Sequence, residues 1–481
     1  MKTFVKSTVI FVAVLAIQFN ISDGQEKKET VYKNAPKVVL NSTEEMQTPE
    51  FWISRLKSDP DKVILTPAQI VEKNRGTQTM RERINKLRDI NGDPFSIDRV
   101  IRSNDRNGVQ FRIEDPLTIK TFPGDSLRAR LRTHRDFFDS RTYYDDRRME
   151  FDDDKKNELY AKTNAEAIPD VITPRYGIVS THAMNRILPT SQEAFGKPDN
   201  WYVKGLQGTS CDVATSVAIL HESKDKDWYY IRSEDSFGWT QAVNIAVGSP
   251  DEIRDYVDAK DFIVALTHKI PVYSNDSFES FLTHLYMASK FKLIAKNGRG
   301  YHVLVPFRNA DGQVKFVDGW VKPDAKVSVG YQPFTQRNVF NTLFNLLYRP
   351  YSMNDADHEW NCCGYMRVVL KTFGIKNGNW PAFEMHYSDN VFVFPSDTPR
   401  EKKYEYLTKC EPGLCLVGSD GHMNMFLGNV NGRNYVIHMG GYDYTLEDGT
   451  VMMYRRVNVN ETELEGGYNV DNWTKISSLK P

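Results

Sequence analysis

Two successive sets of short strand patterns in the middle of the chain constrain its fold more than any other feature. From Arg175 to Val247 the sequence period switches to two, with turn residues between short strand patterns, and a second set of such patterns follows. The first set comprises the runs 217–220, 228–231, 238–239 and 245–247. The second comprises 262–266, 291–294, 302–305 and 314–317, with turns at 297–298 and 311–312. We predict two related small β-barrels, with one larger β-domain as the alternative.

The bulk properties are those of a large globular protein. Its 481 residues exceed one ordinary hydrophobic core, so roughly two to four domains are expected. A hydrophobic content of 40% is sufficient for packed domains. The formal net charge is −1 and no basic run resembles a nucleic-acid-binding stripe, so we predict no nucleic-acid partner.

The first residues have the features of an export signal. Lys2 and Lys6 precede an apolar run at 9–17, and small residues at 22–24 allow cleavage after Gly24. The apolar run is short for a membrane span, although an uncleaved anchor is the alternative. We predict a signal peptide at 1–24 and a secreted or periplasmic protein, with no integral membrane segment after cleavage. Residues 25–50 are polar and are expected to form a loose leader.

Helical patterns flank the strand sets. From Pro49 to about Tyr160 the chain is helical and heavily charged, and the stretch 128–156 is expected to wrap over other domains with few core residues. After the strands come an amphipathic helix at 338–348, a second helix from Cys362, and further strands between 414 and 459. A helix block followed by an antiparallel sheet is an α+β pattern.

Cys362 is a candidate nucleophile because of its position at the start of a helical pattern. Apolar residues recur at helical spacing after it, and Gly374 ends the pattern. A thiol at a helix N-terminus faces unpaired backbone N–H groups and the positive end of the helix dipole. Both favour the thiolate, which is the nucleophilic form.

Two histidines on later strand patterns are candidate partners for this thiol. His422 precedes the apolar run 423–428, and His438 ends the run 435–438. One cysteine and two histidines can supply a nucleophile, a base and an orienting group. The alternative is that Cys362 is a buried small hydrophobe and that both histidines are satisfied core residues.

The remaining cysteines and histidines indicate no metal or cofactor. Cys410 and Cys415 flank a turn that could bring them together, and the odd total of five leaves at least one thiol outside any disulfide. No zinc-ligand spacing and no glycine-rich phosphate-binding loop is present. We therefore predict neither a bound metal nor a cofactor.

The order of these segments resembles the NlpC/P60 family of exported cysteine peptidases, which have a papain-like fold. The matching segments are Pro350-Tyr351, Asn361-Cys362-Cys363-Gly364, Gly421-His422 with Phe426-Leu427-Gly428, and His438. The two strand sets resemble bacterial SH3 domains, and the stretch from Phe51 to Asn74 resembles the family's N-terminal stabilising segment. The resemblance implies a multidomain α+β protein. Its predicted parts are a helical N-terminal segment at 49–165, SH3-like domains at 170–250 and 260–330, and an NlpC/P60 domain at 335–475.

The resemblance also implies a role for each candidate residue. Cys362 would attack a peptide carbonyl, His422 would take the thiol proton and later protonate the leaving amine, and His438 would orient the ring of His422. The backbone N–H of Cys362 would donate to the oxyanion, and Tyr351 is placed to assist. The first SH3-like domain would border the groove and restrict substrate length.

The resemblance implies that Tyr351, Asn361 and Cys363 bind the substrate, and the chain departs from the family pattern at three places in this region. Asn361 replaces an aspartate that receives the free amine of short muropeptides, so amine recognition is altered; the alternative is that Asn361 only caps the helix. Cys363 replaces a serine, and it would either pack against the core or form a vicinal disulfide with Cys362. The family's Trp-Gly-Gly is replaced by Met353-Asn354-Asp355.

The resemblance implies an exported cysteine peptidase whose partners are peptidoglycan peptides or muropeptides. The expected scissile bond joins γ-D-glutamate to a diamino acid such as diaminopimelate or lysine. One alternative is a catalytically inactive protein that binds wall fragments and retains a vestigial NlpC/P60 domain. Acyl or lipid chemistry on a related fold is another.

Overall fold

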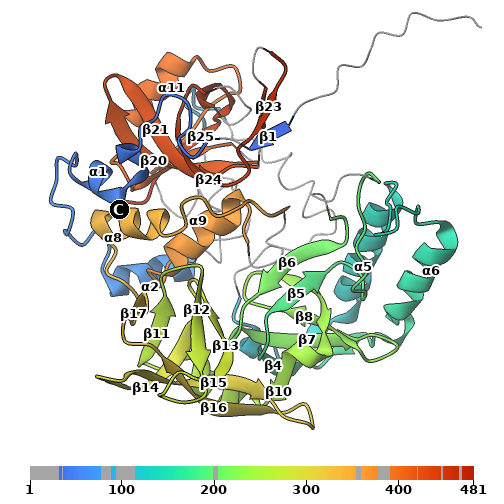
Figure 1. Ribbon diagram of the computed structural model, residues 1–481. Helices are drawn as coiled ribbons and strands as arrows, with labels where there is room; N and C mark the ends of the chain where they lie inside the picture. The colour runs from blue at the N-terminus through green and yellow to red at the C-terminus, as the bar shows by residue number, and fades with distance from the viewer. Residues whose placement is uncertain are drawn as a thin grey trace, which may run out of the picture.

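The computed structural model describes residues 32–34, 36–76, 88–93, 114–198, 204–353, 359–376, 390–419, 421–441, 443–445, 448–464 and 469–480. The predicted signal peptide at 1–24 lies outside them. Figure 1 shows three parts grouped around the helix α9 (Cys362–Lys371). They are the first strand set with its N-terminal helices, the second strand set, and a C-terminal part of helices and sheet.

The first strand set forms a seven-stranded antiparallel sheet in the order β10-β4-β7-β8-β9-β5-β6. Its strands are β4 (Arg175–Val179), β5 (Ala183–Arg186), β6 (Gln207–Cys211), β7 (Ser216–Glu222), β8 (Trp228–Arg232), β9 (Phe237–Gln241) and β10 (Ile245–Gly248). Tyr230 and Trp239 of this sheet are buried against Leu127 and Leu131 of an N-terminal helix.

The second strand set forms a separate seven-stranded sheet in the order β13-β12-β16-β15-β14-β11-β17. Its strands are β11 (Phe262–Ala265), β12 (Lys269–Tyr273), β13 (Phe281–Tyr286), β14 (Lys290–Asn297), β15 (Gly300–Arg308), β16 (Val314–Val321) and β17 (Val327–Val329). Helix α7 (Pro250–Val257) connects the two sheets, and Ser249 caps it by accepting a hydrogen bond from the Glu252 amide.

The two sheets share one topology. If the strands of each sheet are renumbered 1 to 7 along the chain, the first sheet has the order 7-1-4-5-6-2-3. The second sheet has the same order when it is read from its β17 edge. The runs predicted from the alternation pattern lie in these strands, and they form two sheets instead of one larger sheet. Two chain segments that fold with the same seven-strand order are structural repeats, which supports the prediction that they are related.

The C-terminal part has three layers. Its central sheet has the order β18-β25-β19-β20-β21-β24 and contains β18 (Asn390–Val393), β19 (Cys415–Gly418), β20 (Met423–Val430), β21 (Arg433–Met439), β24 (Val457–Glu461) and β25 (Lys475–Ser478). Helices α8 (Gln336–Phe344) and α9 pack on one face, where Met366 meets Met425 and Ile437 in one buried cluster. Helix α11 (Arg400–Leu407) packs on the other face through Leu407.

The N-terminal helices are distributed over the other parts. Helix α1 (Pro49–Ile53) buries Trp52 against the C-terminal core. Helix α2 (Pro67–Gly76) carries Asn74 near its C-terminal end. The Asn74 side chain accepts a hydrogen bond from the Lys376 amide and donates one to the Gly374 carbonyl. Helices α5 (Gly124–Asp139) and α6 (Asp153–Lys162) cover the first sheet. The stretch 128–156 buries more than was expected, including Leu131, Phe138, Tyr143 and Phe151.

The expectation of a loose leader is wrong for residues 36–50. Asn41 donates from its side chain to Glu461 at 2.7 Å, and its carbonyl accepts from the Tyr435 hydroxyl at 2.6 Å. Val39 is buried beside Tyr454. Preceding residues form β1 (Tyr32–Asn34), which pairs in parallel with β23 (Val451–Met453). The polar composition of the segment concealed this packing, because part of it consists of hydrogen bonds made by polar groups.

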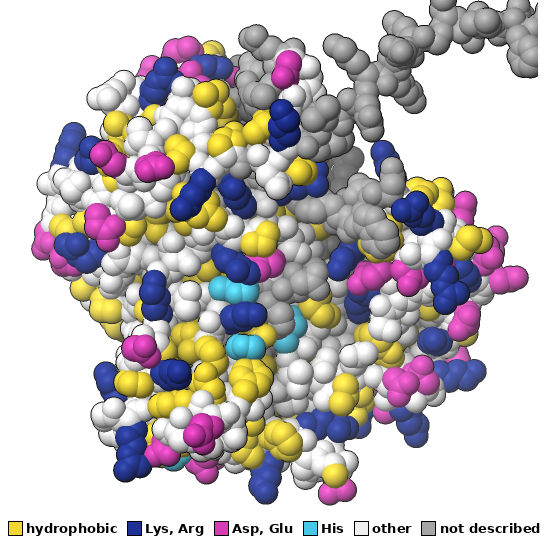
Figure 2. Space-filling view, in the orientation of Figure 1, with side chains coloured by type: hydrophobic (Ala, Val, Ile, Leu, Met, Phe, Trp, Pro, Cys, Tyr) yellow, Lys and Arg dark blue, Asp and Glu magenta, His cyan; other side chains and the backbone are white. Residues whose placement is uncertain are grey.

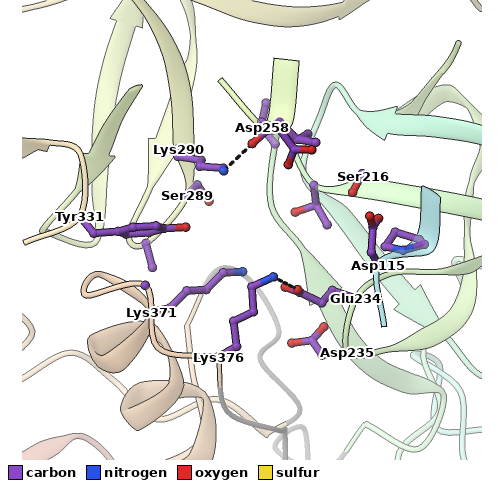
Figure 3. Close-up of a pocket in the computed structure, with 17 residues that line it drawn as sticks. Asp115, Ser216, Glu234, Asp235, Asp258, Ser289, Lys290, Tyr331, Lys371 and Lys376 are labelled. Carbon is purple, nitrogen blue, oxygen red and sulfur yellow. Dashed lines mark hydrogen bonds and ion pairs between the residues drawn. The ribbon is translucent and has the colours of Figure 1, made fainter. Parts of the chain in front are cut away.

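All three parts of the molecule meet at the C-terminal end of α9, around a cavity of about 210 Å³ (Figure 3). Arg367 of α9 pairs with Asp235 of the first part at 3.0 Å, and Lys376 pairs with Glu234. Lys290 of the second sheet donates to the Val257 carbonyl beside the same cavity. These contacts hold the far end of the helix that begins at Cys362.

Candidate active site

Cys362 is the first residue of α9, and the turn before it is organised by Asn361. The side-chain oxygen of Asn361 accepts a hydrogen bond from the Gly364 amide at 2.8 Å, with Asn361 in an extended conformation. This is the geometry of an N-cap. The observed contact matches the capping alternative for Asn361, while its predicted part in substrate binding stays a prediction.

The thiol of Cys362 is buried and yet acidic. Its pKa is held well below the ordinary value, chiefly by a hydrogen bond with Cys363, and then by the charge of His422 and a hydrogen bond with it. Burial acts in the opposite direction. The two sulfurs of Cys362 and Cys363 are 3.7 Å apart, and Cys362 also lies 3.8 Å from the Gly421 carbonyl. A lowered pKa increases the fraction of thiolate, the nucleophilic form, at a given pH.

Cys363 itself packs into the C-terminal core beside α8. None of the five cysteines, all of which lie in the described part of the chain, forms a disulfide in the structure. Cys363 therefore has the packing role considered for it, with an added hydrogen bond to the Cys362 sulfur.

His422 and His438 lie close together, and His422 is next to the Cys362 thiol. The Nε2 atom of His422 is 2.7 Å from the Nδ1 atom of His438, and their rings are nearly perpendicular. His422 directly precedes β20, and His438 lies in β21, which pairs with β20. Gly418 lets the backbone of His422 lie close to β19, because a Cβ at Gly418 would be 2.2 Å from the His422 carbonyl oxygen. Cys362, His422 and His438 thus meet from three separate elements.

Burial keeps His438 neutral. It lowers the pKa of His438 well below the ordinary histidine value, and the nearby charge of His422 lowers it further. A neutral imidazole can hydrogen-bond to the ring of His422 without placing a second positive charge beside it.

A further residue, Asn424, joins the site and was not predicted from the sequence. Its side-chain oxygen lies 3.0 Å from Nε2 of His422, and its side-chain nitrogen donates to the Val417 carbonyl at 3.1 Å. Asn424 is 1% exposed. One signal could have found it: residues two apart in a strand point to the same face, so a polar residue two positions after His422 faces the same way.

Tyr351 lies at the loop that precedes α9. Its backbone pairs in parallel with Trp360, two residues before Cys362, and its ring lies against Gly441, where a Cβ would be 2.7 Å from the ring. Gly441 follows β21, which carries His438. Tyr351 is therefore placed between the loop that precedes Cys362 and the strand that contains His438.

The second sheet supports the same loop. His268 at the start of β12 lies 3.4 Å from Glu359, and Glu359 also pairs with Arg349. The ring of His268 meets Trp360 edge to face at 5.5 Å. The first SH3-like domain is expected to border the groove, and the contacts described here add the second sheet to the surroundings of this loop.

The face of the molecule in this view carries charges of both signs. Figure 2 shows Lys or Arg side chains interspersed with Asp or Glu over the described part of this face, and histidines near its middle. Within the described residues, no group of His, Cys, Asp or Glu could hold a metal ion. No helix in the described ranges is both long and apolar enough to cross a membrane.

Comparison with known proteins bears on the fold. The family described as SH3 domain (SH3b1 type) matches residues 201–241, which include β6, β7, β8 and β9. An NlpC/P60 endopeptidase from Photobacterium damselae subsp. piscicida has a similar structure, with a TM-score of 0.69 at 16% identity, over 94% of this chain and 99% of that one. An NlpC/P60 family protein from Bacillus cereus is matched over 64% of this chain and 100% of that one, at 13% identity and a TM-score of 0.43, which is too low to add to the argument. No curated protein sequence matches this chain.

The chain therefore has the fold of an NlpC/P60 endopeptidase and contains an SH3 domain. The structural match extends over nearly the whole molecule, so both strand sets and the C-terminal part take part in it. The fold implied by the sequence motifs is confirmed at this level.

Proposed function

We propose that the protein is a cysteine endopeptidase that hydrolyses peptidoglycan stem peptides. The observation that carries the proposal is the buried meeting of Cys362, His422 and His438, with an acidic thiol at the start of α9. A nucleophile next to a base that is oriented by a third group is the arrangement used in acyl transfer. In a fold of this kind, acyl transfer at a peptide carbonyl is the chemistry that fits best.

The reaction would proceed in two steps, acylation of Cys362 and hydrolysis of the resulting thioester. His422 takes the proton of the Cys362 thiol, and the sulfur forms a bond to the peptide carbonyl carbon. The C–N bond then breaks as His422 returns its proton to the leaving amine, which leaves a thioester. Water, deprotonated by His422, attacks the thioester and releases the new carboxylate and the thiol.

The oxyanion of each tetrahedral intermediate needs hydrogen-bond donors. The Cys362 amide lies in the first turn of α9, where backbone N–H groups have no partner within the helix, so it is a natural donor. Tyr351 is proposed as the second, supported by its position beside Trp360. We expect Tyr351→Phe to lower kcat more than it raises KM, because this donor would act on developing charge.

The finer assignments follow from the family resemblance. The proposed bond lies between γ-D-glutamate and a diamino acid, and the proposed location is secreted or periplasmic, after removal of a signal peptide at 1–24. We also infer that the second sheet is a second SH3-like domain, since its strand order equals that of the sheet matched as an SH3 domain. The two domains would confine the substrate near the active site.

One experiment tests the central proposal. The protein is incubated with defined muropeptides, and the products are identified by mass spectrometry, with the Cys362→Ala variant as the matched control. Release of a diamino-acid fragment by the parent protein and not by the variant is the expected result. Binding of muropeptides without turnover by either protein would instead indicate a wall-fragment-binding protein.

A further inference from the structure

The neutral ring of His422 can carry its proton on either nitrogen, and only one tautomer can act as a base toward Cys362. Nε2 lies between Asn424 Oδ1 at 3.0 Å and His438 Nδ1 at 2.7 Å. Nδ1 is therefore the nitrogen left for the thiol, which hydrogen-bonds with His422. A proton on Nε2 leaves the Nδ1 lone pair free to accept the thiol proton. A proton on Nδ1 removes that lone pair.

His438 by itself cannot select the tautomer. It is buried and neutral, and the Nδ1 atom of a neutral imidazole either donates or accepts, according to its own tautomer. A hydrogen bond between His438 and His422 can therefore form with the proton on either side. The 2.7 Å contact is satisfied equally by the base-competent tautomer and by the incompetent one.

Asn424 can make the selection because its amide has a fixed orientation. The Val417 carbonyl can only accept, so the group that faces it at 3.1 Å must be the side-chain NH₂ of Asn424. Val417 and Asn424 are register partners in the antiparallel pair β19–β20, which holds this contact in place. Rotation of the amide would bring two oxygens together and lose a buried hydrogen bond. The Oδ1 atom is therefore turned toward His422.

An amide oxygen accepts and never donates, and this property sets the protons of both rings. The Nε2 atom of His422 must carry hydrogen, because otherwise its lone pair would face the lone pairs of Asn424 Oδ1. Asn424 is only 1% exposed, so water cannot relieve this repulsion. The Nδ1 atom of His438 then carries no hydrogen, and its lone pair faces the N–H group of His422. We propose that Asn424 is a positioning residue that selects the base-competent tautomer of His422. The use of His422 as a catalytic base rests on the proposed function, whereas the selection of its tautomer does not.

The tautomer can be measured directly, without substrate. In ¹⁵N-histidine-labelled protein, the ring nitrogens of His422 report whether each carries hydrogen. The measurement uses the Cys362→Ala background, in which no thiolate can charge the ring, at a pH where the ring is neutral. We expect hydrogen on Nε2 when Asn424 is present. Hydrogen on Nδ1 in this protein would overturn the proposal without any further variant.

Substitution then assigns the selection to Asn424 or to His438. Asn424→Leu keeps the approximate volume and removes the acceptor, and it should move the tautomer ratio toward Nδ1–H by roughly fivefold or more, the equivalent of one hydrogen bond of about 1 kcal/mol. His438→Gln should leave the ratio nearly unchanged, because Asn424 still selects. Asn429→Leu, at the exposed end of the same strand, is the matched control. A His438→Gln shift as large as that of Asn424→Leu would refute the proposal.

A second measurement covers the case in which Asn424→Leu folds poorly. Asn424→Thr keeps an acceptor oxygen but adds a hydroxyl donor, so its selection should be weaker than that of asparagine. In protein that retains Cys362, alkylation of that thiol by iodoacetamide, read by mass spectrometry across pH, should be slower at near-neutral pH for both variants. Unchanged alkylation profiles in folded variants would contradict the role. If the parent protein shows the Nε2–H tautomer but does not cleave muropeptides, only the proposed function is contradicted.

Discussion

At the scale of single residues, two buried thiols of this protein differ in acidity for a reason visible in their neighbours. Burial raises the pKa of Cys211, which has only neutral hydrogen-bonding groups close by and the charge of Asp235 acting in the same direction. Cys362 is as deeply buried, but the hydrogen bond with Cys363 and the charge of His422 outweigh burial and lower its pKa. The difference lies in the partners, because desolvation opposes ionisation at both.

The nucleophile prediction concerns Cys362 and His422. Each single change, Cys362→Ala or His422→Ala, should lower kcat by at least about a thousandfold, and the double variant should cost little more, because the two act as a unit. His438→Asn should cost less, since asparagine can still meet the His422 ring. Rates on a defined muropeptide check this. Substantial turnover by Cys362→Ala would show that the nucleophile has been misassigned.

The hydrogen bond from Cys363 makes a prediction about pH. Removing it with Cys363→Ala takes away the largest influence that lowers the pKa of Cys362, so that pKa should rise. At a fixed pH below it, less thiolate is then present, and the pH profile of iodoacetamide labelling should move to higher pH. Cys363→Ser, which keeps a donor, should move the profile less. Coinciding profiles for all three proteins would mean that the contact has no effect on acidity.

At the scale of elements, the start of α9 is set by one side chain that caps it. Asn361→Ala should lower the free energy of unfolding by about 1 kcal/mol, because the Gly364 amide loses its acceptor. Asn361→Ser and Asn361→Asp, which are also good caps, should stay close to the parent in denaturant titrations. Equal stability of the alanine variant would contradict the capping role.

The same residue allows a test of specificity. If position 361 also faces the free amine of the substrate, Asn361→Asp should raise the preference for free-amine over N-acetylated peptides by roughly tenfold, about 1.4 kcal/mol. The physical reason is that a charge-assisted hydrogen bond is stronger than a neutral one. The ratio of kcat/KM for the two peptides decides. An unchanged ratio with unchanged stability would leave Asn361 with capping alone.

At the scale of the whole molecule, the junction at the end of α9 joins the three parts by partly buried charges. The pKa of Asp235 is lowered: burial raises it, but the charges of Arg367 and Lys371 and the Arg367 hydrogen bond outweigh burial. A carboxyl with a lowered folded-state pKa stabilises the protein above its unfolded value near pH 4, and that contribution is lost as pH falls through the folded-state pKa. We therefore expect the free energy of unfolding to decline with acidification below about pH 4.

The partner of Asp235 supplies the corresponding variant. Arg367→Met should destabilise the protein by about 2 kcal/mol, since it leaves the partly buried Asp235 without the charged hydrogen-bond donor at 3.0 Å. Lys402→Met, which removes an exposed pair with Glu405 on α11, should change stability by well under 1 kcal/mol. Thermal and urea unfolding measure both. A cost for Arg367→Met no larger than that for Lys402→Met would show that the junction does not hold the parts together.

Local pattern alone determined several features of this protein. Short runs rich in aromatic and β-branched residues and bounded by turn residues, such as 228–231 and 302–305, located strands of both sheets. The spacing of apolar residues after Cys362 located α9. The order of Cys362, His422 and His438 indicated the fold, which the structural comparison confirms.

Other features depended on contacts between distant residues, and only the tertiary structure decided them. Asn424 looks like an ordinary strand residue until the Val417 carbonyl orients its amide toward His422. His268 lies 92 positions before Trp360 in the sequence, since 360 − 268 = 92, and only folding brings their rings together. Residues 36–50 are polar, and their hydrogen bonds to Glu461 and Tyr435 have no periodic signature. Periodicity records which face of an element is buried, whereas the partner of a polar group is chosen by the whole fold.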